Sequence, residues 1–152
     1  MVDRTVRAGL LLAALPFIAC IPLAAGCTAE STDAHRERIA QLSRAVTELQ
    51  VRDLEVGAGA EASPGRTISV HYTGTLLDGT EFDSSRTRGE PYEFQLGTGA
   101  VIPGWDEGLK GMRVGGRREL VIPSNMAYGR RGQGDIPPNA ALRFDVELMD
   151  VK

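Results

Sequence analysis

The sequence reads LRFDVELM at residues 142–149, where apolar and polar side chains alternate along most of the stretch. Successive side chains of a β-strand point to opposite faces, so positions 142, 144, 146 and 148 share one apolar face. A strand with one apolar and one charged face packs the first against a core and leaves the second in water. We therefore expect the domain to be built around this strand.

Further strands are indicated on its N-terminal side. Ile68, Val70 and Tyr72 alternate with polar residues, and the Asp-Gly pair at 78–79 is typical of a tight hairpin after them. Shorter stretches at 49–54, 94–96 and 118–122 are also indicated as strands.

One helix is predicted in the domain, over residues 103–112. Trp105, Leu109 and Met112 stand at i, i+4 and i+7, which places them on one helical face. Several strands with a single short helix predict an α+β fold, an antiparallel twisted sheet of five to six strands wrapped around that helix.

Composition narrows the classes of function. The chain has 152 residues, of which 42% are hydrophobic and 24% are charged. Its net charge of −3 disfavours a nucleic-acid partner, because phosphates are bound by basic surfaces. Both cysteines, Cys20 and Cys27, lie in the first 27 residues, and His35 and His71 lack the spacing of metal ligands. We expect neither a metal site nor a cofactor.

The N-terminus has the pattern of an export signal. Arg4 and Arg7 precede an uncharged, largely apolar run over 8–26, which ends in small residues and predicts a signal peptide at 1–26. A transmembrane anchor is the alternative, but Pro16 and Pro22 interrupt the run.

Residues 23–27, LAAGC, resemble the lipobox of bacterial lipoproteins. The resemblance implies cleavage before Cys27 and lipid attachment to it, so that the protein is exported and anchored to a membrane of the cell envelope. Cleavage nearby by an ordinary signal peptidase would instead release a soluble protein with a free thiol.

A polar spacer is predicted over 27–46, before the domain at 47–152. Ile39, Leu42 and Val46 recur at helix-like spacing, which favours a short amphipathic helix. A flexible tether is the other interpretation. Under both interpretations the stretch holds the domain at a distance from the membrane and takes no part in catalysis.

Four ordered blocks carry a family resemblance: VHYTG at 70–74, GTEFDSS at 79–85, VIPGWDEG at 101–108, and IPPNA at 136–140 with FDVEL at 144–148. Together they resemble the FKBP-type peptidyl-prolyl cis–trans isomerases, the immunophilins that bind tacrolimus and rapamycin. The resemblance covers about residues 49–152.

The resemblance implies a shallow apolar pocket between the sheet and the helix. Trp105 would form its floor, Tyr128 and the backbone N–H of Ile102 would donate hydrogen bonds to ligand carbonyls, and Asp83 would meet Tyr72 or a nearby arginine, Arg86 or Arg88. The implied catalytic residues are Tyr72, Phe82, Asp83, Trp105, Tyr128 and Phe144, and the implied substrate-binding residues are Tyr92, Val101, Ile102 and Ile136.

Such a pocket needs no acid, base or nucleophile. It would rotate X-Pro bonds of exported or unfolded polypeptides by removing water and by binding the twisted amide. The expected partners are proline-containing chains, macrolides such as tacrolimus or rapamycin, and a membrane through the lipid. A peptide-binding chaperone module with incidental isomerase activity is the alternative.

Overall fold

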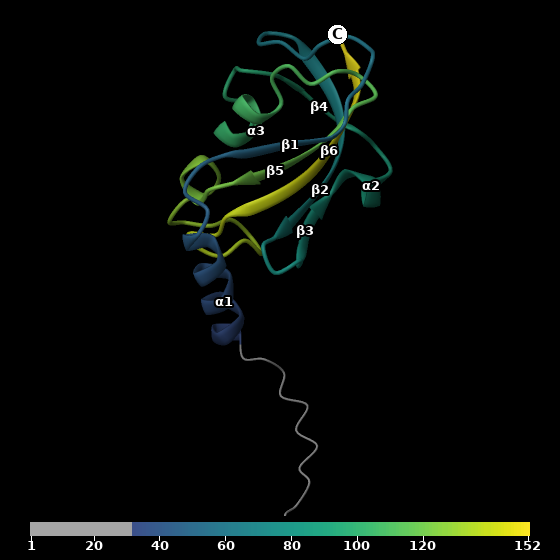
Figure 1. The fold of residues 1–152 in the computed structure, drawn as a ribbon. Helices are drawn as coiled ribbons and strands as arrows, with labels where there is room; N and C mark the ends of the chain where they lie inside the picture. Colours follow the sequence, from purple (N-terminus) through teal and green to yellow (C-terminus); the bar gives the residue numbers. More distant parts are fainter. Residues whose placement is uncertain (1–31) are drawn as a thin grey trace, which may run out of the picture.

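The computed structural model describes residues 32–152 (Figure 1). The predicted signal peptide and Cys27 lie outside the described residues. Within 32–152, no helix combines the length and the apolar character needed to cross a bilayer. The elements are α1 (Thr32–Arg44), β1 (Gln50–Glu55), β2 (Thr67–Leu76), β3 (Glu81–Ser84), α2 (Ser85–Arg88), β4 (Tyr92–Gln95), α3 (Pro103–Gly108), β5 (Arg117–Ile122), a 3₁₀ turn (Ser124–Met126) and β6 (Leu142–Val151).

A six-stranded antiparallel sheet forms the body of the domain. Its order is β1-β5-β6-β2-β3, and β4 pairs with the other half of β2. The alternating strand β6 lies at the centre, where Leu142, Phe144, Val146 and Leu148 are all buried. The predicted α+β fold with a twisted antiparallel sheet is confirmed.

Helix α3 lies against one face of the sheet (Figure 1) and is shorter than predicted. It ends at Gly108 rather than at 112, because the chain turns at Gly111, whose φ of 74° is left-handed and whose N–H donates to the carbonyl of Ala62. Trp105, Leu109 and Met112 are nevertheless all buried, so the predicted apolar face is correct although the helix is not continuous.

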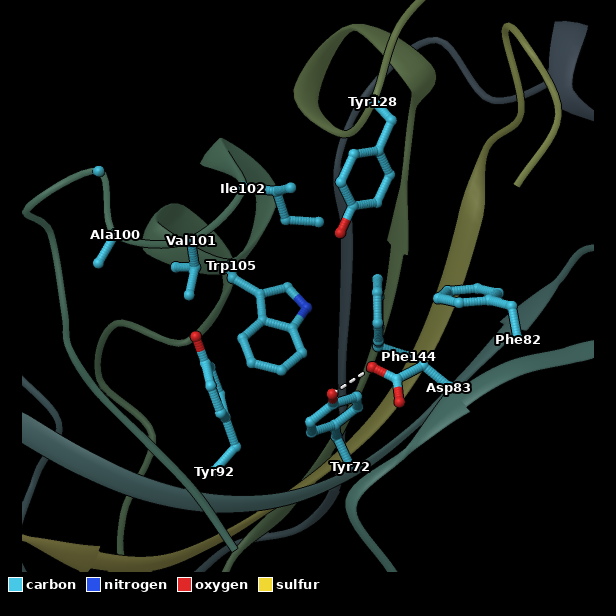
Figure 2. A pocket seen from close by; sticks show the side chains of 11 residues that line it. Tyr72, Phe82, Asp83, Tyr92, Ala100, Val101, Ile102, Trp105, Tyr128 and Phe144 are labelled. Atoms are coloured by element: carbon cyan, nitrogen blue, oxygen red, sulfur yellow. Dashed lines mark hydrogen bonds between the residues drawn. The ribbon is translucent and has the colours of Figure 1, made fainter. Parts of the chain in front are cut away.

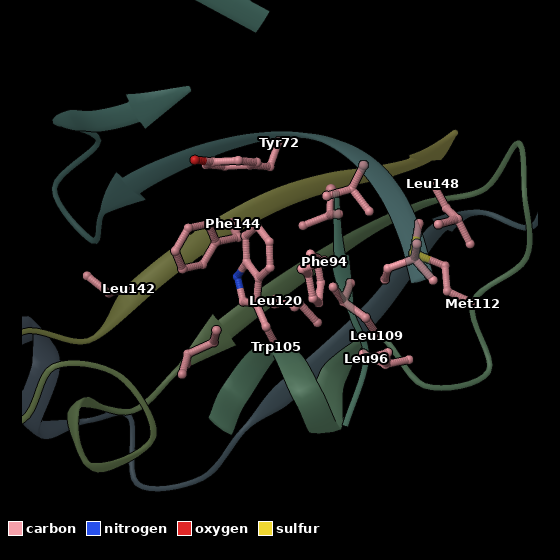
Figure 3. Close-up of a cluster of buried hydrophobic side chains, with 14 of the residues drawn as sticks. Tyr72, Phe94, Leu96, Trp105, Leu109, Met112, Leu120, Leu142, Phe144 and Leu148 are labelled. Carbon is pink, nitrogen blue, oxygen red and sulfur yellow. The ribbon is translucent and has the colours of Figure 1, made fainter. Parts of the chain in front are cut away.

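Two glycines let α3 approach the sheet closely. A Cβ on Gly104 would lie 2.3 Å from Ile122, and one on Gly108 would lie 2.8 Å from Leu120. Both neighbours are core residues of β5. The small face of α3 therefore packs onto β5, and Trp105 between the glycines is directed into the aromatic part of the core (Figure 3).

Helix α1 packs against the domain. Ile39 is fully buried in the core, and the buried hydroxyl of Ser43 donates to the carbonyl of Ile39 and accepts from the N–H of Ala141 (2.7 and 2.8 Å). The Nδ1 of His35 lies 3.3 Å from the Oδ2 of Asp78, in the turn between β2 and β3. Of the two interpretations of this stretch, the structure has a helix, but the predicted apolar face is only partly correct: Ile39 is buried, Leu42 is 40% exposed and Val46 lies beyond the end of α1.

Candidate functional site

A cleft of about 480 Å³ opens between the sheet and α3 (Figure 2). Two strands of the sheet, β2 and β6, contribute Tyr72 and Phe144, and the hairpin strand β3 contributes Phe82 and Asp83. The opposite side comes from α3, from the loop before it and, through Tyr128, from the segment after the 3₁₀ turn. The lining residues are Tyr72, Phe82, Asp83, Tyr92, Gly99, Ala100, Val101, Ile102, Trp105, Tyr128 and Phe144.

Trp105 forms the floor of this cleft. Its indole is 4% exposed and meets Tyr72 and Phe144 edge to face, with ring centroids 5.0 and 5.2 Å apart and interplanar angles of 81° and 82°. The indole Nε1 is buried and has no hydrogen-bond partner within residues 32–152.

One wall of the cleft is closed by hydrogen bonds between its own side chains, and we call Tyr72, Asp83 and Arg88 the hairpin wall. The Tyr72 hydroxyl donates to one oxygen of Asp83, and Arg88 donates to the other oxygen and, at 2.8 Å, to the Tyr72 hydroxyl. The expected contacts of Asp83 with Tyr72 and with an arginine are confirmed. Arg86 instead pairs with Glu147 at 2.6 Å.

The charges of the hairpin wall follow from these contacts. Burial raises the pKa of Tyr72, and the hydrogen bond to Asp83 raises it further. Burial also works to raise the pKa of Asp83, but the hydrogen bonds from Tyr72 and Arg88 outweigh it and hold that pKa below its usual value. At neutral pH the wall is therefore a neutral phenol, a carboxylate and a guanidinium held together.

The opposite wall, formed by Ile102 and Tyr128 and called the loop wall, presents free donors. Within residues 32–152 no acceptor meets the backbone N–H of Ile102 or the hydroxyl of Tyr128. Burial raises the pKa of Tyr128, with added effects of Asp83 and Tyr92, so its hydroxyl keeps its proton near neutral pH. Two residues that line the aromatic cleft thus carry unpaired hydrogen-bond donors, while the polar side chains of the hairpin wall are already paired.

A sequence profile described as FKBP-type peptidyl-prolyl cis-trans isomerase matches residues 59–149. The chain belongs to this family.

Relatives of this FKBP-family chain come from bacteria and yeast. An FK506-binding protein of Neisseria meningitidis serogroup A is 56% identical over 104 residues, which are 68% of this chain and 95% of that protein. The peptidyl-prolyl cis-trans isomerase FPR2 of Saccharomyces cerevisiae is 61% identical over 94 residues, 60% of this chain and 70% of that protein. The isomerase FkpA of Escherichia coli is 49% identical over 121 residues, 78% of this chain but 44% of FkpA.

Solved structures agree with the family assignment. The crystal structure of AtFKBP13 superposes with a TM-score of 0.65 at 43% identity. The superposition covers 68% of this chain and 93% of the AtFKBP13 chain. The crystal structure of FkpA from Escherichia coli also gives a TM-score of 0.65, at 44% identity. The superposition covers 79% of this chain and 59% of the FkpA chain.

The FKBP-type domain brings all but one of the ten predicted pocket residues together. Ile136 is the exception: it is 7% exposed within the core and lines a separate groove beside α1. Gln133 and Ile136 exchange backbone hydrogen bonds of 3.0 and 2.9 Å, so this stretch closes on itself beside the core.

Gly99 and Ala100 line the cleft and were not predicted. Small residues between a strand and a helix carry no side-chain chemistry, and the only signal for them is their place directly before Val101. Within residues 32–152, no group of three or more His, Cys, Asp or Glu side chains is placed to hold a metal ion.

Proposed function

We propose that this protein catalyses cis–trans isomerisation of X-Pro bonds in exported polypeptides, in the cleft over Trp105. The observation that carries the proposal is an aromatic cleft with one wall satisfied internally and two unpaired donors on the other. Membership of the isomerase family supports the same reaction.

The barrier to be lowered is that of amide rotation, about 18–20 kcal/mol, which arises because twisting removes the resonance between nitrogen and carbonyl. The planar amide is the more charge-separated form, so water stabilises it more than the twisted form. The proline ring would lie against the indole of Trp105 and the rings of Tyr72 and Phe144, where water is excluded. Desolvation there would favour the twisted amide.

Hydrogen bonds would hold the peptide over the indole. The N–H of Ile102 and the hydroxyl of Tyr128 would donate to peptide carbonyls on either side of the rotating bond, and each is free to do so. A donor that meets its carbonyl better in the twisted geometry lowers the barrier, whereas one that meets both geometries equally only improves binding.

The same cleft is proposed to bind macrolides of the tacrolimus and rapamycin type. Its volume of about 480 Å³ and its aromatic lining suit a compact apolar ring with a few carbonyl acceptors. A relative that covers nearly the whole domain has the name FK506-binding protein, which supports this ligand class.

Export and lipid anchoring at Cys27 are proposed from the N-terminal sequence. The basic start, the apolar run and LAAGC at 23–27 support a lipoprotein signal. Mass spectrometry of the mature N-terminus tests it: the expected result is a lipid-modified Cys27, and an unmodified chain cleaved elsewhere would overturn the anchor.

The isomerase proposal is tested by the rate of cis–trans interconversion of a short proline peptide, with and without rapamycin. Wild type should accelerate the reaction and rapamycin should block it, while Asp83→Val or Phe144→Tyr should lower kcat/KM by about tenfold or more, which corresponds to about 1.4 kcal/mol. Arg117→Gln, on the outer face where Arg117 pairs with Asp145, is the matched control. No rate above background, with peptide binding retained, would favour the chaperone module instead.

A further inference from the structure

The loop at residues 97–102 connects β4 to α3 and forms part of the cleft. It contributes Gly99, Ala100, Val101 and Ile102 to the lining, and the side chains of the last three are labelled in Figure 2. It also carries the backbone N–H of Ile102, which has no acceptor within residues 32–152. It belongs to no strand of the sheet. Its position therefore depends on contacts that no strand pairing supplies.

Asp106, in the first turn of α3, supplies such contacts. One carboxylate oxygen accepts the N–H of Gly97 at 2.8 Å, and the other accepts the N–H of Gly99 at 2.9 Å. Both glycines have left-handed backbones, with φ of 77° and 74°, a conformation that side chains rarely adopt. Two charge-assisted bonds, accepted by separate carboxylate oxygens, define the direction of the loop as well as its distance from the helix.

The same residue is tied to the far end of the loop. The carbonyl of Ile102 accepts from the backbone N–H groups of Trp105 and Asp106, at 2.9 and 3.3 Å. The loop is thus held at its beginning by the Asp106 side chain and at its end by the first turn of α3. Asp106 itself does not line the cleft.

We propose that Asp106 is a positioning residue: its carboxylate holds the loop at 97–102 so that the Ile102 N–H faces the bound prolyl peptide. This inference rests on the proposed isomerase function. Because Asp106 is only half-buried and the neighbouring Leu96, Trp105 and Leu109 remain buried in the core, loss of the carboxylate should release the loop without unfolding the domain.

The next residue provides a matched control. Glu107 is exposed on the same helix and pairs with Lys110 at 2.7 Å, with no contact to the loop. Glu107→Gln changes charge by the same amount and leaves the carboxylate of Asp106 in place.

The experiment measures kcat and KM for a proline peptide on the full mature chain, together with amide hydrogen exchange at Gly97 and Gly99. For Asp106→Ala we expect kcat/KM to fall about tenfold, chiefly through KM, because a displaced donor weakens binding of planar and twisted amide alike. Exchange at the two glycines should accelerate. Asp106→Asn, which keeps one carbonyl acceptor, should fall between wild type and Asp106→Ala, and Glu107→Gln should match wild type.

Unchanged KM and kcat in Asp106→Ala, with faster exchange at Gly97 and Gly99, would overturn the inference, since the loop would then move without consequence. If Asp106→Ala does not fold, Asp106→Asn decides by the same readouts: an unchanged KM overturns the inference, and a raised KM supports it. Inactive wild type would instead refute the isomerase function itself, so the two failures are distinguishable.

Discussion

The two walls of the cleft differ in how their polar groups are used. On the hairpin wall every polar side chain is bonded to another: Tyr72 to Asp83, and Arg88 to both. On the loop wall the Ile102 N–H and the Tyr128 hydroxyl have no partner within residues 32–152. The hairpin wall keeps its shape without a ligand. The loop wall gains its hydrogen bonds only when a carbonyl group enters the cleft.

The contrast follows from the cost of unpaired groups. A buried polar group without a partner costs about 1–3 kcal/mol, so polar groups beneath an apolar substrate are best paired in advance. Donors at the edge of an open cleft reach water while it is empty and exchange that water for the substrate. The comparison predicts that changes on the hairpin wall lower stability as well as activity, whereas changes on the loop wall lower activity and leave stability nearly unchanged.

The largest expected effect on stability and activity comes from removing the Trp105 indole, which forms the floor of the cleft between the two walls. Trp105→Ala deletes contacts with Tyr72, Phe94 and Phe144, and should lower the free energy of unfolding by about 3–5 kcal/mol and abolish measurable catalysis. Urea denaturation followed by circular dichroism measures the first effect and the peptide assay the second. Tyr92→Ala, at the 40% exposed rim, is the control and should cost much less stability. Equal losses for the two variants would contradict the assignment of Trp105 as the floor.

An intermediate effect is expected from the same chemical change made on each wall. Tyr72→Phe removes a hydroxyl with two partners and should lower the free energy of unfolding by about 1 kcal/mol. Tyr128→Phe removes a hydroxyl with none, so stability should stay within about 0.5 kcal/mol of wild type. The activity of Tyr128→Phe should fall by about two- to tenfold, the value of one neutral hydrogen bond.

Denaturant midpoints and kcat/KM of the two tyrosine variants, compared side by side, test this contrast. If Tyr128→Phe is the less stable of the two variants while its activity is unchanged, then the distinction between a paired hairpin wall and an unpaired loop wall is wrong.

The smallest expected effect is a change in pH dependence on the hairpin wall. The hydrogen bonds from Tyr72 and Arg88 hold the pKa of Asp83 below its usual value against the opposing effect of burial. A carboxyl with a depressed pKa stabilises the folded state at pH above its unfolded pKa of about 3.9, and this contribution is lost as pH falls through the folded pKa. Arg88→Met should therefore raise the pKa of Asp83 and lower the denaturation midpoint at pH 7, with the difference shrinking below about pH 4.

Carboxyl-carbon NMR titration of Asp83 and denaturation at several pH values measure these changes. Arg86→Met is the control, because Arg86 pairs with Glu147 outside the cleft. A midpoint difference that persists unchanged at pH 3 would show that Arg88 acts through something other than the charge of Asp83.

Much of this architecture could be predicted from local patterns. The alternation of β6, the Asp-Gly hairpin and the helical spacing of Trp105 and Leu109 depend only on neighbours in sequence. Most of the cleft followed from motif resemblance, since blocks such as VIPGWDEG place their residues on one loop and one helix.

The failures have physical reasons. Helix α3 ends early because Gly111 adopts a left-handed φ and its N–H bonds Ala62, a residue far away in sequence. Ile136 leaves the cleft because its loop closes through Gln133 and turns the side chain into the core. Arg88 could be named only as one of two candidates, because both arginines follow Asp83 within five residues.

The sequence by itself determined the strands, the helical face and the family, since periodicity and ordered motifs are properties of neighbouring residues. Only the tertiary structure decided which arginine closes the hairpin wall, that α1 is docked through Ile39 and Ser43, and that Asp106 holds the loop at 97–102. These contacts join segments through side-chain direction and backbone turns, and no local pattern encodes the distance between two segments until the chain has packed.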